Sequence, residues 1–325
     1  MKPDGTTGPP KGTKKFSFVG VTTRGSAIRR VFPAWAVRLG LGDVELTGWD
    51  LPVGATARDY RAVVQAIKED PANLGGLVTT HKVALYGACS DMFDWADPLA
   101  QLCEEVSCFS KRDGAFRAHA KDPVSSARCL DEVLPPGYWS ATGAEALLLG
   151  AGGADLAISV HLLNGRADED RPARVIAVDV DNARLESMRA VHRRTGSSVP
   201  VSYVCNTSAR QNDALLAALP PGSLVVNGTG MGKDLPGCPL TPDAAFPEKG
   251  IVWELNYRGE LGFLHLAEQQ RRTRSLVVND GWRYFVHGWT CAIEETFDLR
   301  VNSELLEELS QMALQHRQPV DLPAE

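Results

Sequence analysis

The segment from Ala146 to Ala157, "ALLLGAGGADLA", constrains the fold of this chain more than any other stretch. Its leading apolar residues predict a buried parallel strand, and Gly150, Gly152 and Gly153 then open a helix, with Ala154 in the same turn. Glycines between a strand and a helix let the main chain turn tightly and approach a pyrophosphate at the helix N-terminus. The segment therefore predicts a dinucleotide-binding turn of the Rossmann type. A plain glycine-rich turn is the alternative.

The next predicted strand, "RVIAVDVD", ends at Asp179. A carboxylate at this place can accept hydrogen bonds from the ribose hydroxyls of NAD, and its charge would repel the 2′-phosphate of NADP. We therefore expect NAD as the cofactor in preference to NADP. Two alternatives stay open: Asp179 caps a turn, or the nearby Asp181 takes the ribose.

Strand and helix patterns alternate along the rest of the chain, which predicts an α/β fold. Before residue 122, β-rich segments at 16–23, 44–52 and 74–82 are separated by helical patterns. The segment "VSCFSKRDGAFRAHAKD" predicts a hairpin with its turn at Lys111–Gly114. Later strands are expected in "VSYVC", "SLVVNGTG" and "GIVWELNY", and the C-terminal part is helical.

Composition excludes several classes of protein. The net charge of −6 argues against a nucleic-acid partner, and no apolar run is long enough for a membrane span. The seven cysteines and seven histidines are scattered, without the spacing of a disulfide framework or a metal site. We expect a cytoplasmic protein with free thiols and no metal. The Pro, Gly, Lys and Thr of residues 1–14 predict a disordered lead-in.

Lys82 follows the predicted strand in "GLVTTHKVAL", and two interpretations compete. A lone lysine after a strand is usually a solvated charge. A lysine can also act as a catalytic base where burial and its surroundings lower its pKa. The residue type alone does not decide between these two interpretations of Lys82. The order of motifs along the chain is needed to decide.

From Phe16 to about Leu299, that order resembles the shikimate/quinate dehydrogenase family. "GLVTTHK" resembles the family motif N-V-T-x-P-H-K, and "VSCFSKRDGAFRAHAKD" its V-N-T hairpin, which ends in N-T-D. "VVNGTGMG" is similar to V-N-A-T-x-x-G-M, "WELNY" to D-x-x-Y, and "DGWRYFVHG" to D-G-x-x-M-L-x-x-Q.

The resemblance implies an N-terminal α/β substrate domain, a Rossmann-type dinucleotide-binding domain, and C-terminal helices that return to the first domain. The expected boundaries are residues 15–125 with 281–325 for the substrate domain, and 126–280 for the Rossmann domain. It implies NAD(P)-dependent, reversible oxidation of a ring secondary alcohol to a ketone by a monomer or homodimer.

The resemblance also implies roles for individual residues. Lys82 falls on the catalytic lysine and Asp122 on its aspartate partner. The expected substrate-binding residues are Ser26, Arg29, Thr80, Ser107 and Tyr257. The expected cofactor-binding residues are Gly150, Gly152, Gly153, Ala154, Asp179, Asn227, Thr229 and Gly232. For Arg29, as for the neighbouring Arg24 and Arg30, an exposed surface charge is the alternative to carboxylate binding.

Several family positions that bind substrate have lost or shortened their polar groups. These departures are Ile28, Gly76, Val78, Ser107, Ala120 and Gly288. A buried polar group without a partner costs about 1 to 3 kcal/mol, so we expect a modified, less hydroxylated shikimate-like ring, such as an intermediate of secondary metabolism. Serine, alanine and glycine also leave volume where the family has asparagine and glutamine, so a larger ring is expected as well. Trp282, Tyr284 and Trp289 are either core residues or the floor of the substrate site.

Two other functions stay open. The loss of polar groups at the substrate-binding positions would also suit a dinucleotide-binding sensor or partner protein without dehydrogenase activity. A third possibility is a lysine-assisted dehydration or imine reduction on the same scaffold.

Overall fold

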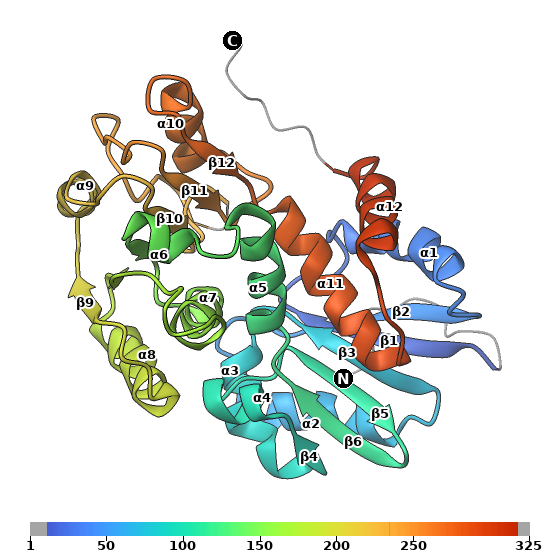
Figure 1. Ribbon diagram of the computed structural model, residues 1–325. Helices are drawn as coiled ribbons and strands as arrows, with labels where there is room; N and C mark the ends of the chain where they lie inside the picture. Colours follow the sequence, from blue (N-terminus) through green and yellow to red (C-terminus); the bar gives the residue numbers. More distant parts are fainter. Residues whose placement is uncertain (1–11, 234, 318–325) are drawn as a thin grey trace. The chain divides into compact units, whose positions relative to one another are not determined.

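The computed structural model describes residues 12–233 and 235–317, and its chain divides into two compact units (Figure 1). The first unit holds residues 12–122 and 286–317, and the second holds the described residues between 123 and 285. The sequence placed these divisions after residues 125 and 280. Residues 1–11 of the predicted lead-in lie outside the described part, and the first strand begins at Lys14.

The first unit is built on a mixed six-stranded sheet of order β2-β1-β3-β5-β6-β4. Its strands are β1 (Lys14–Gly20), β2 (Val44–Asp50), β3 (Asn73–Val78), β4 (Trp95–Ala96), β5 (Cys108–Arg112) and β6 (Ala115–His119). Strands β1, β2 and β3 are parallel, whereas β5 runs antiparallel to both β3 and β6. Strands β3 and β6 therefore run in the same direction and end at the same edge of the sheet.

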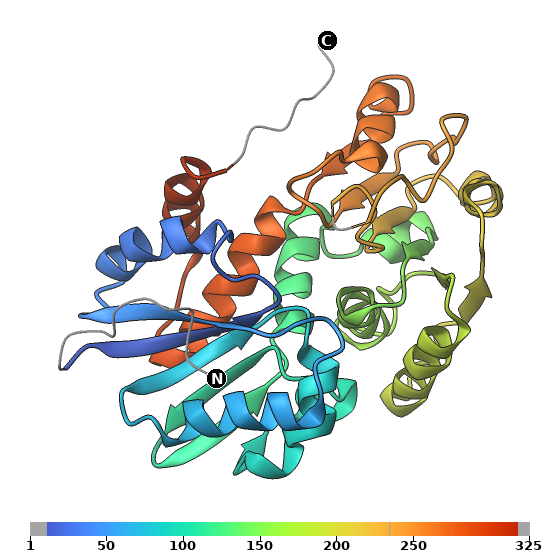
Figure 2. The same cartoon turned by 180° about the vertical axis from the view of Figure 1, so that it is seen from behind.

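Helices cover both faces of this sheet (Figure 2). The apolar side chains of α2 (Ala57–Glu69) and α3 (Lys82–Cys89) pack on one face, with the short α4 (Pro98–Cys103) and the 3-10 turn at Ser90–Met92 nearby. On the other face, Phe16 of β1 stacks on Phe32 of α1 (Ile28–Arg38) and meets Trp289 of α11 (Trp282–Phe297). Trp35 of α1 donates a 2.9 Å hydrogen bond to the carbonyl of Leu309 in α12 (Ser303–Leu314).

The hairpin predicted from the sequence is present. Arg112 of β5 pairs with Ala115 of β6, so the loop contains only Asp113 and Gly114. Both loop residues have positive φ, 53° and 75°, as a type I′ turn requires. The hairpin carries the chain from Ser107 to Asp122 across the sheet and back.

The second unit is built on an all-parallel six-stranded sheet of order β12-β11-β10-β7-β8-β9. Its strands are β7 (Ala146–Leu149), β8 (Val175–Asp179), β9 (Val201–Cys205), β10 (Leu224–Asn227), β11 (Ile251–Glu254) and β12 (Val277–Asn279). Counted within this unit, the order is 3-2-1-4-5-6, the Rossmann arrangement. The order reverses between β7 and β10, and dinucleotides bind at the carboxyl ends of strands at such a point.

Helices also flank both faces of the second sheet. The helices on one face are α5 (Asp122–Val133), α6 (Tyr138–Thr142), α7 (Gly153–Asn164) and α8 (Asn182–Thr195). On the other face, α9 (Ala209–Ala217) and α10 (Gly262–Gln270) contribute Leu216 and Phe263 to a second apolar layer. The predicted fold class is confirmed. No helix in the described part of the chain combines the length and apolar character that crossing a membrane requires.

Candidate active site

Lys82 and Asp122 meet because they follow two strands that end at the same sheet edge. Lys82 opens α3 just after β3, and Asp122 opens α5 just after β6. The Lys82 ammonium contacts Oδ2 of Asp122 as a hydrogen-bonded ion pair. The two side chains are 21% and 10% exposed, so the pair is mostly shielded and still reachable from solvent.

A third ionisable group belongs to this pair, and the sequence analysis did not identify it. Glu105 precedes β5 at the same sheet edge and is completely buried. The amide of Val106, the next residue, donates a 3.1 Å hydrogen bond to the carbonyl of Lys82. Within the part of the chain that the structure describes, neither carboxyl oxygen of Glu105 has a hydrogen-bond partner. A buried charge without a partner is costly, so the carboxyl favours its neutral form.

Charges within this cluster control its protonation. Burial raises the pKa of Glu105 to about 8, and the charge of Asp122 adds to that rise. Burial lowers the pKa of Lys82, as the sequence suggested, but Asp122 and Glu105 raise that pKa by more. The pKa of Lys82 is therefore above its ordinary value. Lys82 carries its proton at neutral pH and is ready to donate it.

Ser107 fixes the turn that carries Asp122. Its hydroxyl, buried at the start of β5, accepts a 2.6 Å hydrogen bond from the amide of Lys121. Ser107 was expected to bind substrate, and this bond gives its hydroxyl a structural partner. The shorter side chain in place of the family's asparagine thus orients the residue next to Asp122.

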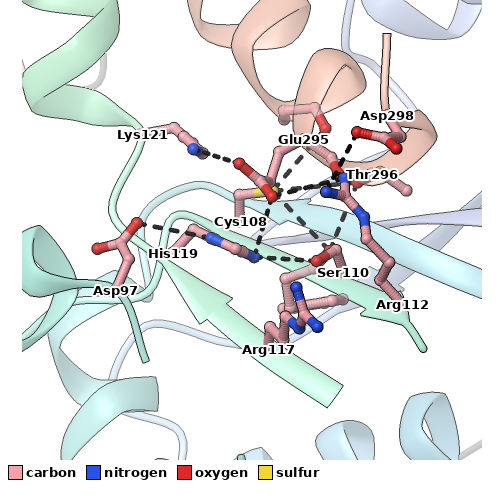
Figure 3. Close-up of polar contacts among 12 residues, drawn as sticks. Asp97, Cys108, Ser110, Arg112, Arg117, His119, Lys121, Glu295, Thr296 and Asp298 are labelled. Carbon is pink, nitrogen blue, oxygen red and sulfur yellow. Dashed lines mark hydrogen bonds and ion pairs between the residues drawn. The ribbon is translucent and has the colours of Figure 1, made fainter. Parts of the chain in front are cut away.

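A polar network extends from Lys121 to α11 (Figure 3). The Lys121 ammonium lies 2.5 Å from Glu295, and the His119 imidazole lies between Ser110, at 2.9 Å, and Asp97, at 3.6 Å. Burial raises the pKa of Glu295, but Lys121, His119 and Arg112 more than offset it and lower that pKa. The network ties the end of β6 to α11 and so holds the Asp122 turn.

The other predicted substrate residues of the first unit differ in their surroundings. Ser26 is half-buried before α1, and Thr80 is exposed next to the Lys82 turn. Arg29 directs its guanidinium at the fold, donating to the carbonyl of Leu46 at 2.8 Å and to Thr23 at 3.3 Å. His81 is buried and bonded to Tyr60 and to the carbonyl of Leu51, which makes it a packing residue.

The departures from the family motifs do not all open space. A Cβ at Gly76 would lie 2.5 Å from the Ser17 carbonyl and 2.7 Å from the Phe109 ring. The volume expected there is filled, so that expectation is wrong for Gly76. At Gly288 a Cβ would meet no atom of the described residues within 4 Å, which leaves room there.

In the second unit, the glycine turn has the geometry of an anion site. Gly150 has φ of +126°, which only glycine adopts without strain. Gly152 is the N-cap of α7 and provides no side-chain cap. The first amides of a helix lack intrahelical partners, and here no side chain of the cap takes them. Gly152, Gly153 and Ala154 are partly exposed, so the residues present fit a pyrophosphate.

Asp179 ends β8 beside this turn and supports it. Its Oδ2 accepts a 2.9 Å hydrogen bond from the amide of Ala151, and its Oδ1 accepts one from the amide of Asp181. Asp181 is the N-cap of α8 through the amide of Ala183. The guanidinium of Arg184 lies 3.9 Å from Oδ2 of Asp179, so a positively charged side chain is also present beside this carboxylate.

The turn after β10 lies on the other side of the strand-order reversal. Asn227 donates to Glu254 of β11 at 2.7 Å and accepts from the Thr229 hydroxyl at 2.7 Å. Burial raises the pKa of Glu254 to about 7, although its hydrogen bonds lower it. Gly232 has φ of +82° in the same turn.

The predicted aromatic residues of α11 are packed into the fold. Trp289 lies 4% exposed against Phe18 in the first unit. In the second unit, Trp282 packs edge to face on Tyr257, with ring centroids 5.4 Å apart. The core interpretation holds for both tryptophans, and Tyr257 is anchored by the ring of Trp282.

A curated shikimate dehydrogenase (NADP(+)) from Methylocella silvestris is 31% identical to this chain over 231 residues, which span 70% of the chain and 72% of that protein. The chain belongs to the shikimate/quinate dehydrogenase family. This is a family of NAD(P)-dependent oxidoreductases. No family model matches the sequence.

Two solved structures show the family fold at low sequence identity. Quinate dehydrogenase from Corynebacterium glutamicum in complex with NAD aligns with a TM-score of 0.73 and 19% identity, over 93% of this chain and 99% of that one. Shikimate 5-dehydrogenase from Listeria monocytogenes in complex with shikimate and NAD aligns with a TM-score of 0.70 and 18% identity, over 94% and 98%.

Proposed function

We propose that this protein reduces a ring ketone to a secondary alcohol, and oxidises that alcohol in reverse, with NAD as its cofactor. The ion pair of Lys82 and Asp122 carries the proposal. It combines a proton donor with a carboxylate that orients it, at the end of two strands and with limited exposure. When bound, the nicotinamide supplies or accepts the hydride.

The proton side of the reaction follows from the charges. In the reducing direction, the Lys82 ammonium gives its proton to the carbonyl oxygen as the carbon gains a hydride. In the oxidising direction, the neutral amine of Lys82 takes the hydroxyl proton. Asp122 stabilises the ammonium in both directions, and its turn is held by Ser107. Because the pKa of Lys82 is raised, reduction is favoured at neutral pH and oxidation at alkaline pH.

The substrate is a cyclic compound related to shikimate but less hydroxylated. Ile28, Val78 and Ala120 offer no side-chain hydrogen bonds where the family motifs place polar groups. A substrate hydroxyl facing them would lose its partners, at about 1 to 3 kcal/mol each. Ser26 and Thr80 retain hydroxyls for the remaining polar groups of the ring.

The second unit is proposed to hold the dinucleotide. Gly150, Gly152, Gly153 and Ala154 would take the pyrophosphate, Asp179 the adenosine ribose, and Asn227, Thr229 and Gly232 the nicotinamide side. Tyr257 is the proposed contact of this unit with the substrate. NAD is preferred because Asp179 would face the 2′-phosphate of NADP with a like charge.

The test is the absorbance of reduced nicotinamide with both dinucleotides. The panel contains shikimate, quinate, their dehydro and amino analogues, and simpler cyclohexanols and cyclohexanones. Turnover of a ring alcohol or ketone supports the proposal, and mass analysis of products separates it from dehydration or imine reduction. Dinucleotide binding without turnover of any panel member would instead favour a binding protein.

A further inference from the structure

Asp155 occupies a position that Rossmann turns reserve for the smallest residues. In the pattern G-x-G-x-x-G/A, the third small residue lets the helix pack closely on the strand. Gly150 and Gly152 are the first two members here, and the third position is Asp155, in the first turn of α7. A carboxyl group therefore stands where helix and sheet come closest.

Two glycines make room for this carboxyl. A Cβ at Gly150 would lie 2.5 Å from Oδ2 of Asp155, and a Cβ at Gly228 would lie 2.2 Å from Oδ1. Real Cβ atoms do not come this close to other atoms. Gly228 also departs from the family motif V-N-A-T, which has alanine at that position. The missing methyl group at Gly228 and the carboxyl of Asp155 thus form a matched pair.

The carboxyl of Asp155 is fully buried. Among the described residues neither carboxyl oxygen has a hydrogen-bond partner of normal geometry, although the amides of Gly152 and of Asp155 itself act on the carboxyl and lower its pKa. Burial raises the pKa of Asp155 to about 8, and the charge of Asp179 raises it further. The group is therefore neutral at pH 7 and ionises in the mildly alkaline range.

The carboxyl also lies at the point where the strand order reverses. Gly150 follows β7 and Gly228 follows β10, the two strands between which a dinucleotide binds. An ionised Asp155 would place a negative charge behind the amides that a pyrophosphate needs. Like charges repel more strongly around a buried group than in water, because the surroundings screen them less.

We propose that Asp155 controls dinucleotide binding: the turn accepts a dinucleotide while this carboxyl is protonated and releases it when the proton is lost. The inference rests on the proposed function, because it assumes that the turn binds a dinucleotide. Binding at alkaline pH then takes up one proton.

Other ionisable groups near the turn could also make dinucleotide binding depend on pH, and their effects have to be distinguished from that of Asp155. Asp179 on β8 acts on it directly, with Arg184 of α8 beside Asp179. Glu254 on β11, bonded to Asn227 of β10, titrates near pH 7. A variant that changes Asp155 alone makes the distinction.

The experiment measures the Kd of NADH, which is stable in alkali, by fluorescence between pH 7 and pH 9.5. The full chain is compared with Asp155→Asn, and with Asp168→Asn as an exposed control in the same unit. We expect the wild type and the control to lose about 30-fold in affinity over this range, as one proton with a pKa of about 8 requires. Asp155→Asn should bind as the wild type does at pH 7 and stay nearly constant.

A second readout needs no ligand. The pKa of Asp155 is higher in the folded state, so its ionisation destabilises the fold as pH rises from the unfolded value toward about 8. The free energy of unfolding of the wild type should therefore fall relative to Asp155→Asn between pH 4 and pH 9. Parallel curves would overturn the inference.

The binding outcomes separate this inference from the proposed function. If the wild type binds NADH with a pH dependence that Asp155→Asn retains, another group carries it and the inference is wrong. The same holds if wild-type binding does not change with pH, or if a folded Asp155→Asn fails to bind at pH 7. If the wild type binds no dinucleotide at any pH, the proposed function fails and the inference falls with it.

Discussion

Gly228 lies against the carboxyl of Asp155 so closely that a Cβ at position 228 would be 2.2 Å from Oδ1 and 2.4 Å from Oδ2. The two residues are far apart in the sequence, on the turn after β10 and on α7. Each therefore limits what the other can be. An alanine at 228 needs a smaller residue at 155, and an aspartate at 155 needs glycine at 228.

This relationship predicts non-additive stability changes. Gly228→Ala should destabilise the wild type by about 1 to 3 kcal/mol, because the new methyl group overpacks the site. In an Asp155→Ala background the same change should cost little, giving a coupling energy of about 0.5 to 3 kcal/mol. Urea unfolding of the wild type, both single variants and the double variant measures this coupling. Additive effects would show that the two side chains do not compete for space.

Glu105→Gln should shift the pH dependence of catalysis downward. In the wild type, Glu105 ionises as pH rises through about 8, and its charge then helps Lys82 to retain its proton. The Gln variant lacks that charge, so Lys82 should lose its proton at a lower pH than in the wild type. Alcohol oxidation should then begin, and ketone reduction decline, at lower pH.

The measurement is kcat/KM in both directions across pH, with Glu104→Gln as the control. Glu104 is the adjacent residue in sequence and is exposed, so its loss should leave the profile unchanged. Identical profiles for the wild type and Glu105→Gln would show that Glu105 does not act on Lys82.

Asp122→Asn should reduce kcat by about 100- to 10,000-fold, the usual contribution of a positioned acid–base system. The amide keeps the shape of the carboxylate and removes the charge that orients the Lys82 ammonium. Asp113→Asn, in the exposed hairpin turn, is the matched control and should retain full activity. Near-normal turnover by Asp122→Asn would remove the carboxylate from the proposed mechanism.

Asp179→Ser should shift cofactor preference toward NADP. The change removes the negative charge that would face a 2′-phosphate, and Arg184 remains 3.9 Å from the position of the lost carboxylate oxygen. We expect the ratio of kcat/KM for NAD over NADP to fall by about tenfold or more, the effect of roughly 1.4 kcal/mol. An unchanged ratio would contradict the role given to Asp179.

The sequence predicted the fold class because its signals are local. The hairpin followed from Asp113 and Gly114, whose type suits a two-residue turn, and the Rossmann turn followed from a strand, glycines and a helix. The burial of Glu105 could not be predicted from local sequence. Its neighbour Glu104 has the same side chain, yet Glu104 caps α4 with φ of +52° and is exposed, whereas Glu105 is buried. Only the path of the chain after α4 distinguishes them.

The sequence does mark Asp155 as unusual. The spacing from Gly150 and Gly152 already marks it as the wrong residue type for the third position of the motif. The burial of this carboxyl could not be predicted from the sequence, because the space for it is provided by Gly228, which follows a strand far away in the sequence. The same limit applies to Gly76, where Ser17 and Phe109 fill the space that the shorter residue suggested.

The most direct test of the central claim is the oxidation of NADH with the best ring ketone of the panel, measured for Lys82→Met beside the wild type. Lys14→Met, at an exposed lysine of the same unit, is the control. We predict that Lys82→Met binds NADH normally and loses at least about 100-fold in kcat, while Lys14→Met matches the wild type. A Lys82→Met enzyme that turns over like the wild type would contradict the account.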